Sequence, residues 1–390
     1  MNFDFYVAKL RLETARALRP LFPQSSWFKN AQRALLRQLA KDTLTIRPES
    51  LFKTDSAVTT IQKPIDILIP VYNGYDILPA CLDSVLKNTD LPFRVYLADD
   101  ASPDGRIRPL LSDYQKRFKD KIIVLRNEQN LGIIRTLNKL ISASENDFLI
   151  LNTDTELPPG WASRLFRPIF SNPNMAAAGP WSNAADQQTI WFGCEEGPLP
   201  FSVDKADKQA ASFGPLEITQ IPTLVSFCMA VSRRAACDVG GLDEAYGRGY
   251  YDETDWLFRA KKKGYSFCLV PDVFVYHKGT ASFPSAEKKA LMAHNGKLFE
   301  TRYPGSVKAM RRRRHHPLLT MLRFLMLAKC LRAQYQDLCL LPAPQTNPVA
   351  YTWTREDDVY RYELIEGDAY EVLYSTLPPE QLDALTRPNL

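Results

Sequence analysis

The residues from Asn152 to Glu156 carry the most informative chemistry in the sequence, because their side chains are an amide, two hydroxyls and two carboxylates. They directly follow an apolar run at residues 148–151, whose length predicts a buried strand. In an open α/β sheet, ligands bind just beyond the carboxyl ends of the strands. Oxygen ligands in that place suit a hard divalent cation that also holds substrate phosphates. The alternative is that the cluster only caps the helix expected to begin near Trp161.

Three more polar segments follow predicted strands in the same manner. They lie at residues 70–73, 99–105 and 251–256, and His277 ends the last predicted strand. Because ligand sites gather at the carboxyl ends of strands, these segments are expected to converge on one site.

Strands and helices alternate from residue 65 onward, which indicates an α/β fold with a mostly parallel, Rossmann-like sheet flanked by helices. Strands are predicted at 65–69, 93–98, 122–125, 148–151, 176–179, 224–231, 267–270 and 273–277. Helices are predicted at 78–86, 110–118, 132–142, 161–170, 233–239 and 254–263. The pattern loosens at residues 182–222, which are predicted to form long loops at the site.

The length of 390 residues predicts one large domain with appendages. These are a helical N-terminal appendage at 1–60, the α/β domain at 61–284, and a mostly helical C-terminal region with an acidic tail at 285–390. A formal charge of +5 argues against a dedicated nucleic-acid-binding protein. Seven scattered cysteines, none of them in a C-x-x-C pair, fit reduced thiols in a cytoplasmic protein. We expect neither a signal peptide nor a membrane-spanning helix, because no apolar stretch has the required length.

In their order and approximate spacing, the polar segments resemble those of the inverting glycosyltransferases of family 2, which have the GT-A fold. The resemblance covers residues 64–283 and ends on the segment at 276–282. Each motif alone is weak, whereas the ordered set is specific.

The resemblance implies a nucleotide-sugar donor. Pro70, Tyr72 and Asn73 correspond to the loop that cups the nucleotide base. Asp100, with Asp99 beside it, corresponds to the carboxylate that accepts a hydrogen bond from the base. An acceptor-only carboxylate suits the ring N–H of uracil or thymine, so UDP or dTDP is favoured. The alternative for both acids is a solvated turn or a helix cap.

Asn152 and Asp154 occupy the D-x-D position of the family, so Asp154 is expected to bind Mg²⁺ or Mn²⁺ and Asn152 to face the ribose. His277 corresponds to a histidine that completes the metal shell in part of the family. An amide at Asn152, where an aspartate is common, leaves more of the coordination to diphosphate oxygens. Asn183 is expected either to contact the sugar or diphosphate, or to hold its own loop together.

The segment at residues 252–255 resembles the E-D-x-D segment of the family with its first two residues exchanged. By this correspondence Glu253 is expected to be the catalytic base that deprotonates an acceptor hydroxyl, and Asp252 is the second candidate for that role. The alternative is an acidic first turn of an ordinary helix. Asp255 and Trp256 are expected to cap and pack that helix.

The leading hypothesis is an inverting, metal-dependent transfer of a hexosyl or deoxyhexosyl group to a glycan or lipid-linked glycan, in the synthesis of a bacterial surface polysaccharide or glycoconjugate. A second hypothesis is a non-catalytic sugar- or partner-binding module on the same frame, which the replacements at Asn152 and Glu253 suggest. A nucleotidyltransferase fits poorly, because residues 70–76 contain a single glycine and no lysine or arginine.

The basic segment at residues 308–332 has two interpretations. It either lies peripherally on the anionic inner face of a membrane, or packs as an amphipathic helix on the α/β domain or on a second subunit. The sequence leaves the oligomeric state open.

Overall fold

The computed structural model describes residues 62–190, 202–219, 221–279 and 285–313, the strands between residues 351 and 375, and four single positions near residue 322. The chain divides into two compact units, Thr54–His316 and a unit made of Met1–Lys53 with Pro317–Leu390. The unit Thr54–His316 contains every candidate site residue. The N-terminal appendage predicted at residues 1–60 lies outside the described residues.

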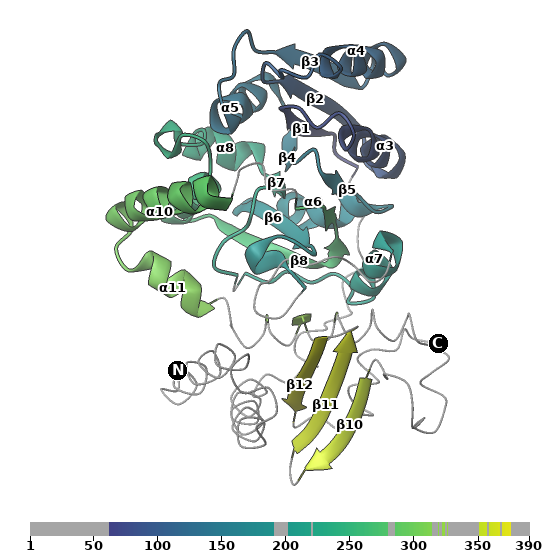
Figure 1. The fold of residues 1–390 in the computed structure, drawn as a ribbon, viewed down its shortest axis with the longest axis vertical. Helices are drawn as coiled ribbons and strands as arrows, with labels where there is room; N and C mark the ends of the chain where they lie inside the picture. Colours follow the sequence, from purple (N-terminus) through teal and green to yellow (C-terminus); the bar gives the residue numbers. More distant parts are fainter. Residues whose placement is uncertain are drawn as a thin grey trace. The chain divides into compact units, whose positions relative to one another are not determined.

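A seven-stranded sheet forms the centre of this unit, in the order β3-β2-β1-β4-β7-β6-β8 (Figure 1). Its strands are β1 (Ile65–Val71), β2 (Phe93–Asp99), β3 (Ile122–Arg126), β4 (Asp147–Leu151), β6 (Met175–Trp181), β7 (Cys228–Val231) and β8 (Ser266–Phe274). Parallel pairs join β1 to β2, β1 to β4, β2 to β3 and β6 to β8, whereas β7 is antiparallel to β4 and β6. The prediction of an α/β fold with a mostly parallel sheet is confirmed.

Helices cover both faces of the sheet. Three of them contribute buried side chains to one core with β1, namely α3 (Leu78–Asn88), α4 (Ile107–Arg117) and α6 (Trp161–Ser171). Helix α5 (Ile133–Ala143) contacts β1 and β2 but adds nothing to that core, so it covers the opposite face. Helices α7 (Val203–Ala211), α8 (Arg233–Val239) and α9 (Asp252–Lys262) contact β6 or β8.

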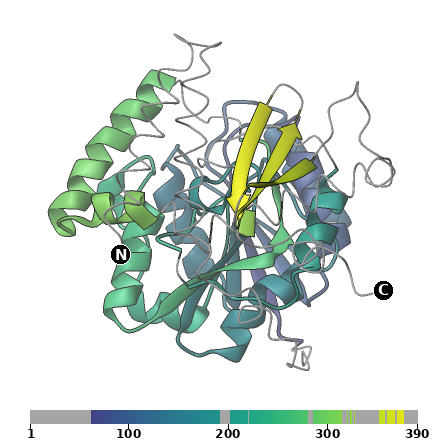
Figure 2. The same cartoon turned by 90° about the horizontal axis from the view of Figure 1, so that it is seen from below.

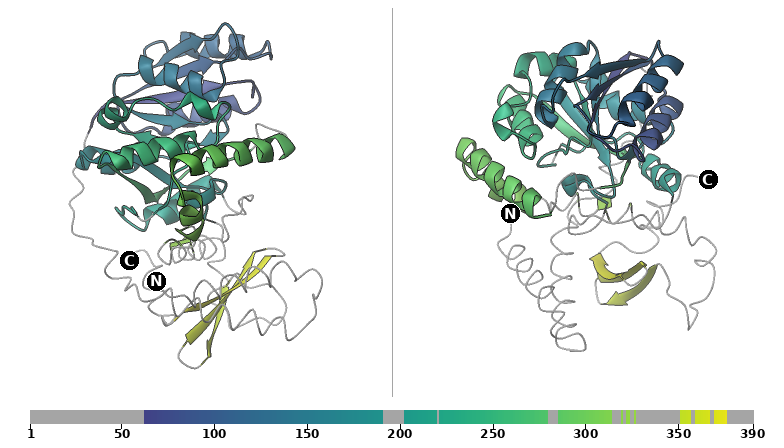
Figure 3. Two further views of the ribbon diagram at one scale, coloured as in Figure 1. Left: turned by 90° about the vertical axis from the view of Figure 1, so that its left-hand side faces the viewer. Right: turned by 45° about the horizontal axis from the view of Figure 1, so that its top comes forward.

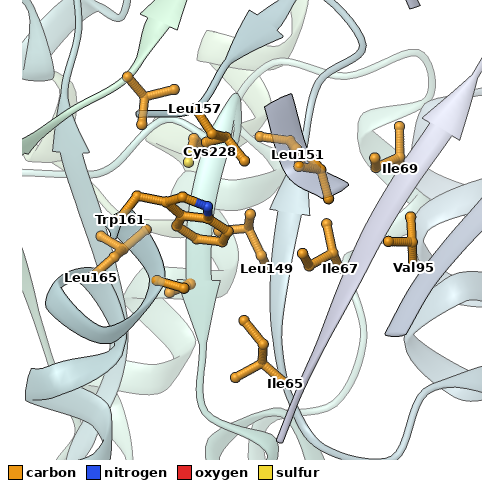
Figure 4. Packing of buried hydrophobic residues seen from close by; sticks show 14 of the residues in the cluster. Ile65, Ile67, Ile69, Val95, Leu149, Leu151, Leu157, Trp161, Leu165 and Cys228 are labelled. Atoms are coloured by element: carbon orange, nitrogen blue, oxygen red, sulfur yellow. The ribbon is translucent and has the colours of Figure 1, made fainter. Parts of the chain in front are cut away.

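The central strands are nearly all apolar because both of their faces are covered. Figure 4 shows the isoleucines of β1 beside Leu149 and Leu151 of β4, with Trp161 of α6 in the same cluster. Burying one such aliphatic side chain contributes about 1.5–3 kcal/mol. This core therefore fixes the strands whose ends carry the candidate site.

Two more helices belong to the same unit, α10 (Ser285–Arg302) and α11 (Ser306–Arg313). The long helix α10, coloured green, runs along the outside of the unit (Figures 2 and 3). The sequence interpretation assigned these helices to the C-terminal region, since it ended the α/β domain at residue 284. The structure instead extends the unit to His316, because α10 buries part of its surface there.

The second unit contains an antiparallel sheet in the order β10-β11-β12. Its strands are β10 (Tyr351–Glu356), β11 (Val359–Glu366) and β12 (Ala369–Ser375). The sequence interpretation expected a mostly helical region and did not foresee them, although aromatic and β-branched residues are enriched there. Among the described residues, no helix combines the length and the apolar character needed to cross a bilayer. Most of the segment at 308–332 lies outside the described residues.

Candidate active site

The loops after β1, β2 and β4 leave the sheet at one edge. Strands β1 and β2 pair residue by residue up to Val71 opposite Asp99, and β4 lies on the other side of β1. A methyl group on Gly74 would lie 3.9 Å from Thr153 Oγ1, so the loop after β1 reaches the turn after β4. The polar segments that follow β1, β2 and β4 therefore lie at one edge of the sheet, as the sequence predicts for these three.

A short two-stranded sheet brings His277 to Asp154. Strand β5 (Thr155–Glu156) pairs antiparallel with β9 (Tyr276–His277), and Lys278 N donates to the Asp154 carbonyl oxygen at 2.9 Å. His277 Nε2 then lies 3.2 Å from Asp154 Oδ1, and both side chains are largely buried. The two residues predicted as metal ligands are therefore neighbours.

Neighbouring groups fix the orientation of the His277 ring. Its Nδ1 is hydrogen-bonded to the carbonyl oxygen of Ala184, which can only accept, so we assign the ring proton to Nδ1. The ring stacks on Phe227 with a centroid separation of 5.0 Å. A neutral His277 then presents its Nε2 lone pair toward Asp154, which is the tautomer that a metal ligand requires.

The donor set of Asp154 and His277 fits Mg²⁺ or Mn²⁺. In the neutral, Nδ1-protonated form of His277, Nε2 and Asp154 Oδ1 are two acceptors 3.2 Å apart, which a shared cation would stabilise; in the doubly protonated form the same contact is an ion pair. Adjacent ligands of an octahedral Mg²⁺ lie about 3 Å apart, so the spacing is suitable. No group of three or more His, Cys, Asp or Glu side chains able to hold a metal occurs among the described residues. Other oxygens, such as those of a diphosphate, would complete the shell.

Two asparagines flank this pair. Asn152 Nδ2 lies 3.5 Å from His277 Nε2, so Asn152 stands beside the pair without adding charge. Asn183 Oδ1 accepts from His277 N (2.9 Å), and Asn183 Nδ2 donates to His277 O (2.8 Å). Because both ends of the Asn183 amide bind backbone, the structure favours its role of holding the loop. Sequence reasoning missed Ala184, since a backbone carbonyl leaves no motif.

The loops after β1 and β2 are tied together by Asn73. Its backbone N donates to Ser102 Oγ (2.9 Å), and its Oδ1 accepts from Asp104 N (3.1 Å). Asn73 has a φ of 60°, a left-handed conformation that asparagine tolerates better than most residues. Tyr72 beside it is 53% exposed, and Pro70 lies in β1 at the start of the loop. A loop held by hydrogen bonds, with the exposed side chain of Tyr72, thus occupies the predicted base-binding position.

The two carboxylates after β2 have different surroundings. Asp100 accepts three hydrogen bonds, from Asn127 Nδ2 (2.7 Å), Leu131 N (2.8 Å) and Gly132 N (2.9 Å), and so holds the start of α5. Asp99 Oδ1 accepts from Ser102 N (3.0 Å), and its Oδ2 has no partner among the described residues. Asp99 therefore keeps the more available acceptor, whereas the sequence favoured Asp100.

The predicted base lies in the first turn of α9, where Asp252 is buried and Glu253 is half-buried. Burial and the adjacent Asp252 carboxylate raise the pKa of Glu253 well above its ordinary value. Burial also raises the pKa of Asp252. The charge of Asp186 adds to the effect on Glu253. Asp186 belongs to the same loop as Ala184, whose carbonyl oxygen binds the His277 ring.

Asp255, on the same turn, has a structural role. It is buried and accepts hydrogen bonds from Tyr246 Oη (3.2 Å), Tyr303 Oη (3.0 Å) and Arg259 Nε (2.8 Å). Trp256 Nε1 donates to a backbone carbonyl of the segment before α9 at 2.8 Å. These contacts agree with the packing expected for Asp255 and Trp256, whereas the expected capping is wrong, because Tyr251 is the N-cap residue of α9 and no side chain of the described residues caps the helix.

Residues 66–239 match the family model described as Glycosyl transferase family 2. The chain carries a family 2 glycosyltransferase domain. Asp252, Glu253 and His277 lie beyond the matched residues, so their roles rest on the geometry described above.

The glycosyltransferase domain has relatives of known name. The chain is 24% identical over 273 residues to the probable N-acetylgalactosaminyltransferase 9 of Caenorhabditis elegans, covering 66% of this chain and 47% of that protein. It is 28% identical over 112 residues to an uncharacterized glycosyltransferase of Haemophilus influenzae, covering 28% of this chain and 36% of that protein. The chain thus spans about half or less of the length of these relatives.

The chain also resembles a solved structure, the mannosyltransferase PcManGT from Pyrobaculum calidifontis in complex with GDP-Man and Mn²⁺. The TM-score is 0.51 at 15% identity, and the likeness covers 87% of this chain and 93% of that chain. At this identity the likeness shows the fold alone, which confirms the predicted GT-A architecture.

Proposed function

We propose that the protein is an inverting, metal-dependent glycosyltransferase that moves a sugar from a nucleotide-diphosphate donor to a hydroxyl acceptor. The observation that carries this proposal is the approach of His277 Nε2 to Asp154 Oδ1, 3.2 Å apart, at the strand edge that the loops after β1, β2 and β4 share. The family match and the paired acids on α9 support the same conclusion.

Asp154 and His277 would hold Mg²⁺ or Mn²⁺, which supplies positive charge to the donor diphosphate and its leaving group. The loop at residues 70–73 would cup the base, and Asp99 or Asp100 would accept a hydrogen bond from its ring N–H. Uracil and thymine carry a ring N–H donor, as guanine does, whereas adenine and cytosine carry none on the same edge; of these carriers we propose UDP or dTDP. Asn152 would face the ribose.

Glu253 would take the proton of the acceptor hydroxyl as that oxygen attacks the anomeric carbon. The new C–O bond forms on the face opposite the diphosphate, whose oxygen leaves with the electron pair of the broken bond. The anomeric centre is thereby inverted without a covalent enzyme intermediate. Such general-base assistance typically contributes a factor of ~10²–10⁴ to the rate.

The acceptor in this proposal is a glycan or lipid-linked glycan of a bacterial surface polysaccharide or glycoconjugate, and contact of residues 308–332 with a membrane would suit a lipid-linked acceptor. The competing non-catalytic module is less well supported. A binding module has no use for two adjacent, partly buried carboxylates whose pKa values are raised, because they cost stability and are typical of catalytic sites.

A thermal-shift panel tests the donor and the metal together. We expect UDP or dTDP with Mn²⁺ to raise the melting temperature, because a ligand that binds the folded state stabilises it. ADP should have little effect. Asp154→Asn should remove the metal-dependent part of the shift, and Asp113→Asn, an exposed acid on α4, should not. Absence of any metal-dependent nucleotide shift in the wild type would contradict the proposal.

A further inference from the structure

Helix α10 holds the loop that leads into the first turn of α9. The Asn295 side chain is buried, and its Nδ2 donates to the carbonyl oxygens of Tyr246 (2.8 Å), Gly249 (2.7 Å) and Tyr250 (3.2 Å). An amide NH₂ carries two protons, so one proton is shared between two of these carbonyls. A single side chain thereby spans the whole stretch at residues 246–250.

The stretch that Asn295 holds has an unusual backbone. Two glycines, Gly247 and Gly249, have positive φ, and so do the aromatic residues Tyr250 (φ 67°) and Tyr251 (φ 71°). Large side chains rarely adopt this conformation, and it persists only where the surrounding structure enforces it.

The same part of α10 also contacts Tyr251. The ring of Phe299 lies 5.3 Å from the Tyr251 ring, measured between centroids. A methyl group on Gly296 would lie 3.3 Å from Tyr251 Oη, so the tyrosine fills the space that this glycine leaves. Because Tyr251 immediately precedes Asp252 and Glu253, its backbone angles determine where the two acids begin.

We propose that Asn295 is a positioning residue for the base. By holding the loop at residues 246–251, it fixes the direction in which Glu253 enters the active site. The inference rests on the proposed function, which makes Glu253 the base. It assigns a role to a helix that lies beyond the residues matched by the family model.

Asn295→Asp is the sharpest test, because the carboxylate keeps the shape but has no N–H for the three carbonyl oxygens. His294→Asp places the same charge on the exposed neighbouring position of α10 and serves as the matched control. In Asn295→Asp, hydrogen exchange at the amides of residues 247–254 should rise about 10-fold or more relative to the control. Donor hydrolysis should fall about 10-fold or more, because misplacing a catalytic group by ~1 Å has large effects.

Hydrolysis is measured as release of UDP or dTDP from UDP-glucose, UDP-N-acetylglucosamine and dTDP-rhamnose with Mn²⁺. The affinity for UDP with Mn²⁺ should change less than about twofold, since Asn295 contacts only the loop before the base. Unchanged exchange, or raised exchange with unchanged nucleotide release, would overturn the proposal. A parallel loss of UDP binding and release would also overturn it, because it would indicate general damage to the fold.

Two further variants keep the outcomes separate. If Asn295→Asp does not fold, Gly296→Ala is measured in the same way, since its methyl group presses on Tyr251 and leaves Asn295 intact. If Glu253→Gln loses nucleotide release while Asn295→Asp keeps it, the inference alone fails. If the wild type releases no nucleotide, or if Glu253→Gln releases it at the wild-type rate, the proposed function fails. The hydrogen-exchange data alone then decide whether Asn295 holds the loop.

Discussion

At the scale of single residues, the proposed base Glu253 carries a cost in stability. Burial beside Asp252 raises its pKa in the folded protein above the unfolded value. The folded state therefore binds this proton more tightly than the unfolded state does. The contribution to stability is fully present below the ordinary carboxyl pKa, and it is lost as the pH rises through the raised value. At alkaline pH the ionised carboxylate, which is the form that the proposed base needs, weakens the fold.

Replacing Glu253 by glutamine separates these two effects. We expect Glu253→Gln to lower the rate of sugar transfer or donor hydrolysis by ~10²–10⁴-fold. At pH 8 the same variant should melt at a higher temperature than the wild type, because it removes a half-buried charge beside Asp252. The measurements are turnover and thermal melting at pH 8, with Asp113→Asn as a surface control. A lower melting temperature would show that the charge of Glu253 does not weaken the fold.

We expect Asp252 to influence the pH at which Glu253, the proposed base, ionises. Activity needs the ionised form, so turnover should be lost as the pH falls through the raised pKa of Glu253. Asp252→Asn removes the neighbouring negative charge and should lower that pKa. The acid limb of the kcat/KM profile should then move to lower pH. An acid limb that stays in place would mean that another group controls it.

At the scale of elements, β5 and β9 are too short to be stable alone, since strands of independent stability need more pairing. Their pairing is supported from outside by Asn183 and Ala184 in the loop after β6, which bind His277 through its backbone and its ring. The geometry of the metal-ligand pair therefore depends on a third segment that supplies no ligand itself.

Asn183→Asp tests this dependence. The new carboxylate can still accept from His277 N, but it cannot donate to His277 O and repels that carbonyl oxygen. Changes around metal ligands typically cost 10–100-fold in metal affinity, so Mn²⁺-dependent UDP binding should weaken by ~10–100-fold. Titration calorimetry with Mn²⁺ measures it, with Asn174→Asp in the exposed turn before β6 as the control. Equal affinities in the two variants would contradict this role of Asn183.

The elements from β1 to β4 could be predicted from the sequence because each is a short apolar run or an amphipathic segment, separated by polar turns. The pairing of β5 with β9 could not, since strands of two residues show no periodicity. The resemblance placed Asp154 and His277 together, and the structure agrees. The resemblance did not reveal that the Asp100 carboxylate accepts hydrogen bonds from the backbone amides at the start of α5, because such bonds have no sequence signature.

At the scale of the whole molecule, the contacts of α10 make it part of the compact unit Thr54–His316. Phe299 is fully buried against Tyr251 and Phe258, and Tyr303 donates a hydrogen bond to Asp255. These contacts are long-range in the chain, so hydrophobic patterning within residues 285–313 gave no indication of them. A domain that stops at residue 284 would lose one side of the packing around α9.

Two truncated chains distinguish these boundaries. The fragment Thr54–His316 should melt cooperatively and bind UDP with Mn²⁺, because it keeps the whole compact unit. A fragment of residues 54–284 loses the burial of Phe299 and Tyr303, worth about 3–6 kcal/mol for two large side chains. That is a large part of the ~5–15 kcal/mol that stabilises a typical domain, so this fragment should melt at a much lower temperature or fail to fold. Circular dichroism on heating compares the two, and equal melting temperatures would show that α10 is dispensable for the fold.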